Sequence, residues 1–395
     1  MSPSVRPFIH TLTSRPFRLT LMLSACLSLT ACEYFETEPQ NQLSSSQIAK
    51  MLPSHVKNSR SWASDIEAVF KELNITRNKR NICTVVAVID QESNFVADPS
   101  VAGLGDKSLK ELESRLNDKL GKPVADYFRN MLQTKPTAKD SFAKQIRRVR
   151  TERELDELYR QIFDYFSKHY KVNAITDVAK VVGGDIAERL NPITTLGSMQ
   201  VHIDYAKQNR RLSMNNDELR RDLYSQYGGL YYGIHRLMLY PADYEKPIYR
   251  FADYNSGMYS SRNASFQNML KTLSGNKISL DGDLLLYDGG SVRSDLSQTE
   301  RILQQLFAKQ GISLTQRQIR SDLKKEKSKS FEQTETYQTV KNLYQKKTKK
   351  KPAYAIMPQV VISGPKLSQN YNTNWFASNV DKRYQRCMAK AKNMA

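Results

Sequence analysis

The chain has 395 residues and a formal net charge of +20, which is enough length for one large domain or two modest ones. Its five histidines are scattered and no CxxC or HExxH spacing occurs, so we expect no metal site. Neither a GxGxxG pattern nor a P-loop is present, and we expect no cofactor.

The first 31 residues predict an export signal. Three arginines precede a charge-free stretch over residues 19–31, which has the length of a signal-peptide core and is too short to span a bilayer. It ends in Leu-Thr-Ala-Cys, which resembles the lipobox of bacterial lipoproteins, so Cys32 is the expected lipid anchor. A rival box ends at Cys26 but leaves a shorter apolar core, and an ordinary secretory signal is the remaining alternative.

Export limits the kinds of polyanion that so basic a chain could bind. Loss of the signal arginines lowers the net charge from +20 to +17. Nucleic acid is the usual partner of such a charge, but export argues against it. Lipid headgroups and peptidoglycan carboxylates are the polyanions of the envelope, although a well-solvated surface explains the charge equally well. Glu33 after the cysteine is similar to the default outer-membrane sorting signal, so we expect lipid anchoring to the periplasmic face of that membrane.

Two cysteines remain after the signal and the anchor, Cys83 and Cys387. In the oxidising periplasm such a pair can form a disulfide, which would fasten the C-terminus to the start of the core. Two free buried thiols are the alternative.

In chain order, residues 32–59 are polar and predict a tether. Residues 61–73 carry apolar side chains at helical spacing, and the apolar run from Ile82 predicts a core helix that ends near Asn94. Residues 107–190 are charged and heptad-like, which predicts three to five amphipathic helices.

The second half is also mainly helical, with a compact stretch over 194–205 and a basic C-terminal region over 281–395. Its lysine runs at 324–330 and 346–352 are expected to be exposed. The elements expected there are helices over 219–239, 246–273 and 374–392 and a strand over 354–362.

Three short segments carry a family resemblance. They are QESNF at 91–95, LGSMQV at 196–201 and FADYNSG at 251–257. Each is weak alone, but together and in this order they resemble the lysozyme-like soluble lytic transglycosylases. The rest of the chain is similar only to a bacterial lipoprotein family of unknown function. The pattern of elements predicts a mainly α class, and the resemblance, which covers about 92–105 and 191–275, implies a lysozyme-like α+β core over 60–280. The helices over 107–190 would then be an insertion, and residues 281–395 form a C-terminal α/β extension.

The resemblance also implies a chemistry on peptidoglycan. Glu92 would be the single acid/base, because a carboxyl in an apolar cleft holds its proton near neutral pH. The family motifs assign substrate binding to neighbouring positions, with Tyr254 hydrogen-bonding Glu92 and Asn255 anchoring the turn. The positions so assigned are Ser93, Gly197, Met199, Gln200, Tyr254 and Asn255.

The sequence departs from the family in ways that leave alternatives open. Glu92 and Gln200 lie 108 positions apart, against roughly twenty in the family, and Ser198 and Ser256 replace a leucine and an alanine. A muramidase-type hydrolase is a close variant of the enzyme. An inactive peptidoglycan-binding or scaffold lipoprotein is the second hypothesis. A structural lipoprotein that binds envelope proteins through the insertion or the basic C-terminus is the third.

Overall fold

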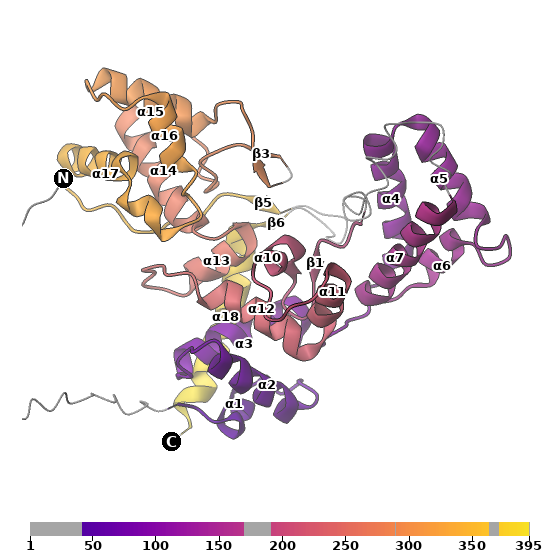
Figure 1. Ribbon diagram of the computed structural model, residues 1–395. Coiled ribbons are helices and arrows are strands. Elements are labelled where there is room, and N and C mark those ends of the chain that lie inside the picture. Colours follow the sequence, from indigo (N-terminus) through magenta and orange to yellow (C-terminus); the bar gives the residue numbers. More distant parts are fainter. Residues whose placement is uncertain (1–41, 170–190, 289, 363–370, 395) are drawn as a thin grey trace, which may run out of the picture. The chain divides into compact units, whose positions relative to one another are not determined.

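The computed structural model describes residues 42–169, 191–288, 290–362 and 371–394 (Figure 1). The described residues all belong to one compact unit. The described chain is mainly helical, as predicted, and its strands are two residues long. No helix among these residues combines the length and apolar character needed to cross a bilayer. The predicted signal and both candidate anchors, Cys26 and Cys32, lie outside the described residues.

The first helices correct the predicted tether. Helix α1 (Ser45–Met51) begins at a capping box on Ser44, and the Ile48 and Met51 side chains are fully buried in the core. Folded structure therefore starts well before residue 59, because the apolar residues at 48, 51, 52 and 56 have a core to enter. Helix α2 (Ser59–Glu72) follows close to its predicted range.

Helix α3 lies at the centre of the first hydrophobic core, as predicted from its apolar run. It spans Lys79–Ser93, is buried along most of its length and ends where Asn94 takes a left-handed conformation. The last helix, α18 (Thr373–Lys392), packs mainly against α3 and against α13 (Ile248–Ser256). The predicted disulfide joins Cys83 of α3 to Cys387 of α18, with the two Cα atoms 5.5 Å apart.

The predicted insertion is helical in its described part. An antiparallel bridge between Ser100 and Thr151 brings the residues before α4 close to the start of α7, so the three helices between them leave and rejoin the chain at one place. Aromatic side chains of Phe128, Phe163 and Phe166 pack inside this group. The helices are α4 (Leu104–Leu120), α5 (Lys122–Thr134), α6 (Phe142–Arg148) and α7 (Glu152–His169). Residues 170–190 of the predicted insertion lie outside the described residues.

After the insertion comes a short hairpin of β1 (Thr195–Leu196) and β2 (Val201–His202), which pair antiparallel. Helix α10 (Ile203–Gln208) follows. The helix predicted over 219–239 is two helices, α11 (Asn216–Tyr224) and α12 (Gln226–Met238). The break falls at Ser225, whose hydroxyl caps α12 by accepting from the Gly228 N–H.

The helix predicted over 246–273 is likewise two, α13 and α14 (Ser260–Ser274). Gly257 separates them with φ +112°, a backbone conformation open mainly to glycine. The buried Asp253 carboxylate stabilises this corner, because it accepts hydrogen bonds from the Tyr259 and Ser261 N–H groups at 2.9 and 2.7 Å.

A second hydrophobic core corrects the predicted C-terminal boundary. It is made by α14 together with elements between residues 278 and 356, whereas α18 belongs to the first core. The predicted extension over 281–395 is therefore divided between two cores. The helices and strands that follow α14 in this second region are β3 (Tyr287–Asp288), β4 (Ser291–Val292), α15 (Gln298–Lys309), α16 (Gln316–Leu323), the 3-10 helix η1 (Lys329–Gln333) and α17 (Glu335–Thr348).

The prediction of a strand over 354–362 is mostly wrong. Only β5 (Val361–Ile362) forms there, and it pairs with β6 (Tyr371–Asn372). The lysines in the runs at 324–330 and 346–352 are exposed or half-buried, but Glu326 within the first run is fully buried.

Candidate functional site

Glu92 occupies the last turn of α3 and is half-buried. The chain turns sharply after it, because Asn94 and Phe95 both have positive φ. Phe95 then packs edge-on against Trp62, with ring centroids 5.3 Å apart, and this contact fixes the turn. The neighbouring Ser93 hydroxyl is buried and donates to the Ile89 carbonyl at 3.2 Å. Ser93 therefore packs within its own helix, which argues against the sugar contact predicted for it.

The β1–β2 hairpin holds the second motif in a tight turn. Gly197 has φ +77°, and a Cβ atom there would lie 2.2 Å from the Leu223 carbonyl oxygen of α11. Ser198, where the family has leucine, is fully buried against Gly229 of α12. A Cβ atom at Gly233 would likewise meet the Met199 side chain. The turn is therefore seated directly on two helices, and only small residues fit at the contact.

The Gln200 side chain is held at both ends of its amide. Its Oε1 accepts from the Thr195 hydroxyl at 2.9 Å, and its Nε2 donates to Glu152 Oε2 at 3.1 Å. Glu152 begins α7 and is 6% exposed. The predicted insertion thus supplies a buried carboxylate to the motif that was expected to bind sugar.

Tyr254 connects the three motifs. Its hydroxyl donates to the Met199 carbonyl oxygen at 2.6 Å, and the Arg236 guanidinium lies 4.5 Å from the centre of its ring. Burial raises the pKa of the Tyr254 phenol far above its usual value, the nearby Arg236 lowers it, and the negative charge of Glu92 raises it. Glu92 therefore lies within electrostatic reach of a phenol that is hydrogen-bonded to the hairpin.

The Tyr254 hydroxyl donates to the Met199 carbonyl, and the hydrogen bond predicted between Tyr254 and Glu92 stays a prediction. Asn255 follows on α13 and is half-buried, and its predicted role beneath the turn stays a prediction.

Two neighbours of the site were not foreseen. Arg236 lies on α12, and Glu152 comes from a part of the chain that carries no family motif. The only local signal for Glu152 is its place in the first turn of a helix, which is typical of any acidic residue there.

No cluster of three or more His, Cys, Asp or Glu side chains able to hold a metal ion occurs in the part of the chain that the structure describes.

Comparison with known proteins gives a family for the chain. A family described as "Protein of unknown function (DUF1615)" matches residues 55–390. The chain belongs to this family. It is 34% identical over 377 residues to the uncharacterized protein YaiW of Escherichia coli strain K12, covering 93% of this chain and 97% of that protein. No solved structure matches. The range matched by the DUF1615 family includes Glu92, the hairpin, Tyr254, both paired cysteines and the helical insertion.

Proposed function

We propose that this protein is a peptidoglycan lytic transglycosylase with Glu92 as its acid/base and a lysozyme-like arrangement of α3, the hairpin and α13. One observation supports this most. Tyr254 is bonded to the Met199 carbonyl and lies within the electrostatic reach of Glu92. A hydrogen bond thus joins α13 to the hairpin, close enough to Glu92 for its charge to act on the Tyr254 phenol, which is the combination that the transglycosylase motifs imply.

The proposed reaction needs one carboxyl group. Glu92 donates its proton to the oxygen that joins muramic acid to the next sugar, and the bond from that oxygen to the anomeric carbon breaks. The Glu92 carboxylate then takes the proton of the C6 hydroxyl of the same muramic acid. The C6 oxygen bonds to the anomeric carbon, which closes a 1,6-anhydro ring and returns the proton to Glu92.

Glu152 and Gln200 support the binding half of the proposal. The Gln200 amide accepts from Thr195 and donates to Glu152 and to the Gly197 carbonyl, so its Oε1 keeps one acceptor position in one fixed orientation. A fixed amide orients a sugar hydroxyl or N-acetyl group at low entropic cost.

The proposal includes lipid anchoring at Cys32, on the periplasmic face of the outer membrane. Gln42 is the first described residue and lies ten positions after Cys32. Ten residues span at most about 35 Å when fully extended. An anchored protein would therefore act within a short distance of the membrane, closer than the predicted tether over 32–59 implied.

The test is digestion of purified sacculi by the wild-type protein and by Glu92→Gln. We expect the wild type to release 1,6-anhydro-muropeptides and the variant to release at least about 100-fold less, since a positioned general acid contributes that much. Glu245→Gln is the matched control, because the Glu245 side chain is exposed on a loop, and it should keep full activity. Mass spectrometry of the products and a thermal melt of each variant are the measurements.

Each other outcome has a defined meaning. Release of products with a reducing-end muramic acid would make the protein a hydrolase. Binding to sacculi without any cleavage would favour the inactive peptidoglycan-binding lipoprotein, and neither binding nor cleavage would end the peptidoglycan proposal.

A further inference from the structure

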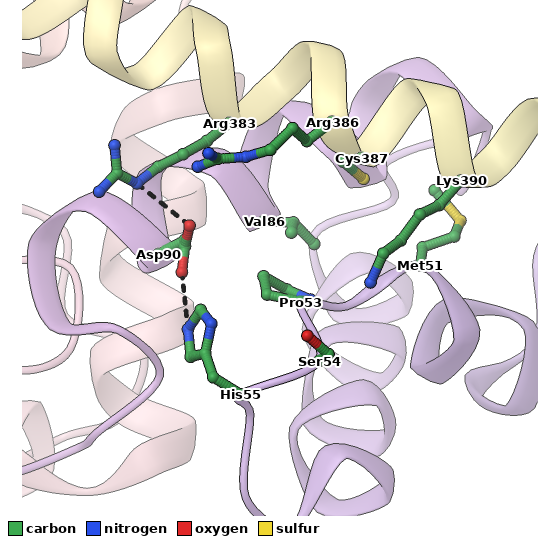
Figure 2. Close-up of a pocket in the computed structure, with 10 residues that line it drawn as sticks. All are labelled: Met51, Pro53, Ser54, His55, Val86, Asp90, Arg383, Arg386, Cys387 and Lys390. Atoms are coloured by element: carbon green, nitrogen blue, oxygen red, sulfur yellow. Dashed lines mark ion pairs between the residues drawn. The ribbon is translucent and has the colours of Figure 1, made fainter.

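A cavity of about 300 Å³ lies between α18, α3 and the loop after α1. Figure 2 shows Arg383, Arg386 and Lys390 reaching from α18 toward Asp90 of α3 and toward His55 and Pro53 of the loop. The cavity is separate from the Glu92 site described above, although Asp90 and Glu92 share one helix.

The cations come from one face of a single helix. Arg383, Arg386 and Lys390 are spaced by three and four residues, so their side chains are neighbours on α18. Like charges at this spacing destabilise a helix. A cluster of this kind therefore needs an opposing charge.

The protein supplies only part of that charge. The buried Asp90 carboxylate lies 3.1 Å from Arg383 Nε and 3.0 Å from His55 Nε2. Lys390 donates to the Leu52 carbonyl oxygen at 2.6 Å, a neutral partner. Within the described part of the chain, no carboxylate lies within ion-pair distance of the exposed Arg386. Two positive charges of the three cations remain after Asp90 is counted.

The helix dipole does not explain this arrangement. Cations are stabilised near a helix C-terminus only within about the last turn. Helix α18 ends at Lys392, so the dipole accounts for Lys390, but Arg383 and Arg386 lie further inside the helix.

We propose that the cavity binds a phosphate group. A phosphate monoester carries close to two negative charges at neutral pH, which matches the excess in the cavity better than a single carboxylate does. Guanidinium groups bind phosphate oxygens through two parallel hydrogen bonds, and an ammonium adds a point charge. Arg386 and Lys390 would bind the phosphate, while Asp90 holds Arg383 in place as a positioning residue.

The phosphate could come from a lipid headgroup or from a soluble ester. The cavity is lined by Met51 at the end of α1 and by Pro53, Ser54 and His55 of the loop that follows, close to where the described chain begins. If Cys32 carries the lipid, as proposed above, headgroup phosphates lie within reach of this part of the protein. Phosphate binding itself does not depend on activity toward peptidoglycan, so either proposal can fail while the other stands.

The experiment compares two double variants of residues 41–395, a unit that contains both hydrophobic cores and the disulfide and lacks both candidate anchor cysteines. Arg386→Gln with Lys390→Gln removes the two proposed phosphate ligands. Lys382→Gln with Lys392→Gln is the matched control, because it removes the same charge from exposed positions on the same helix. Calorimetric titration with inorganic phosphate and with glycerol 3-phosphate measures binding, and acetate at equal ionic strength tests carboxylates.

We expect the double variant that lacks Arg386 and Lys390, the ligand variant, to bind phosphate at least about tenfold more weakly than the wild type, a typical loss for charge-assisted hydrogen bonds. The control should bind like the wild type. Equal losses in both variants would mean diffuse charge attraction and would overturn the proposal. Absence of phosphate binding by the wild type, or equal binding of acetate, would overturn it as well.

Vesicles distinguish the two sources. Phosphatidylcholine vesicles with and without phosphatidic acid are sedimented with each protein. Binding that requires phosphatidic acid and is lost only in the ligand variant assigns the cavity to a lipid headgroup. Phosphate binding in solution without that vesicle effect assigns it to a soluble phosphate ester.

Discussion

At the scale of single residues, the proposed catalytic carboxyl is defined by its surroundings more than by its motif. Glu92 lies in the last turn of the buried helix α3, two residues before Asn94 and Phe95 with their positive φ, so it stands where the helix ends. Tyr254, whose phenol the charge of Glu92 reaches, is hydrogen-bonded to the Met199 carbonyl of the hairpin turn. The motif could identify Tyr254 as a neighbour, but which oxygen its hydroxyl would bond depends on distances of a few tenths of an ångström that no local pattern encodes.

Glu326 shows the same dependence on surroundings in the second core. It lies within a lysine-rich run that was expected to be exposed, yet its side chain is fully buried. Burial raises the pKa of its carboxyl to about 7, although hydrogen bonds from Tyr287 and Leu284 oppose the rise and the charge of Asp283 adds to it.

The raised pKa predicts how stability depends on pH. The folded state holds the Glu326 proton more tightly than the unfolded state, so its stabilising effect is complete below the ordinary value of 4.5 and is lost as the pH rises through about 7. By linkage, Glu326 should lower the free energy of unfolding by up to about 3 kcal/mol between pH 5 and pH 8. Glu326→Gln, which mimics the protonated form, should remove this part of the pH dependence in urea unfolding.

Glu335→Gln serves as the control, because Glu335 is exposed at the start of α17. It should leave the difference between pH 5 and pH 8 unchanged. A pH dependence that survives in Glu326→Gln would show that other groups cause it.

At the scale of elements, the hairpin turn is held by close contact with helices rather than by its own two-residue strands. Gly197 approaches the Leu223 carbonyl of α11, and Gly229 and Gly233 of α12 make room for Ser198 and Met199. The small side chain at Ser198 is explained by this contact, since a larger one would meet α12.

Two glycines with the same φ test this contact. Gly197 and Gly275 both have φ +77°, but a Cβ atom would meet the Leu223 oxygen at Gly197 and nothing within 4 Å at Gly275. Gly275→Ala should cost about 1 kcal/mol from backbone strain. Gly197→Ala should cost a further 1–3 kcal/mol, roughly, from overpacking. Urea unfolding of both variants measures the difference, and equal costs would mean that the hairpin does not rest on α11.

Helix breaks were the least predictable feature at this scale. Hydrophobic periodicity runs through Ser225 and Gly257 without interruption, so it predicted one helix where the structure has two. The cap on Ser225 and the positive φ of Gly257 end those helices, and both depend on how the next helix packs.

At the scale of the whole molecule, α18 completes a core that the N-terminal helices begin. It packs on α3 and α13, and its Cys387 is bonded to Cys83 across 304 positions of sequence. A cross-link that closes so long a loop restricts the unfolded chain strongly.

Removal of the disulfide should therefore cost about 3–5 kcal/mol of unfolding free energy. The measurement is urea unfolding of the wild type and of Cys83→Ala with Cys387→Ala, with peptide mapping of the wild type without reductant as the first step. Two free thiols in that map would contradict the pairing, and equal stability of the two proteins would contradict the entropic argument.

Local periodicity by itself determined the helical class, the core helix that ends at Asn94 and the final helix, and the residue count showed that two cysteines were left that could pair. These predictions were possible because helix spacing and cysteine number can be read from the chain alone. Only the tertiary structure decided that residues 43–59 fold, that the C-terminal region divides between two cores, and that Glu152 contacts Gln200. Each of these depends on which distant surfaces meet, because burial and hydrogen-bond partners are set by packing and not by neighbours in sequence.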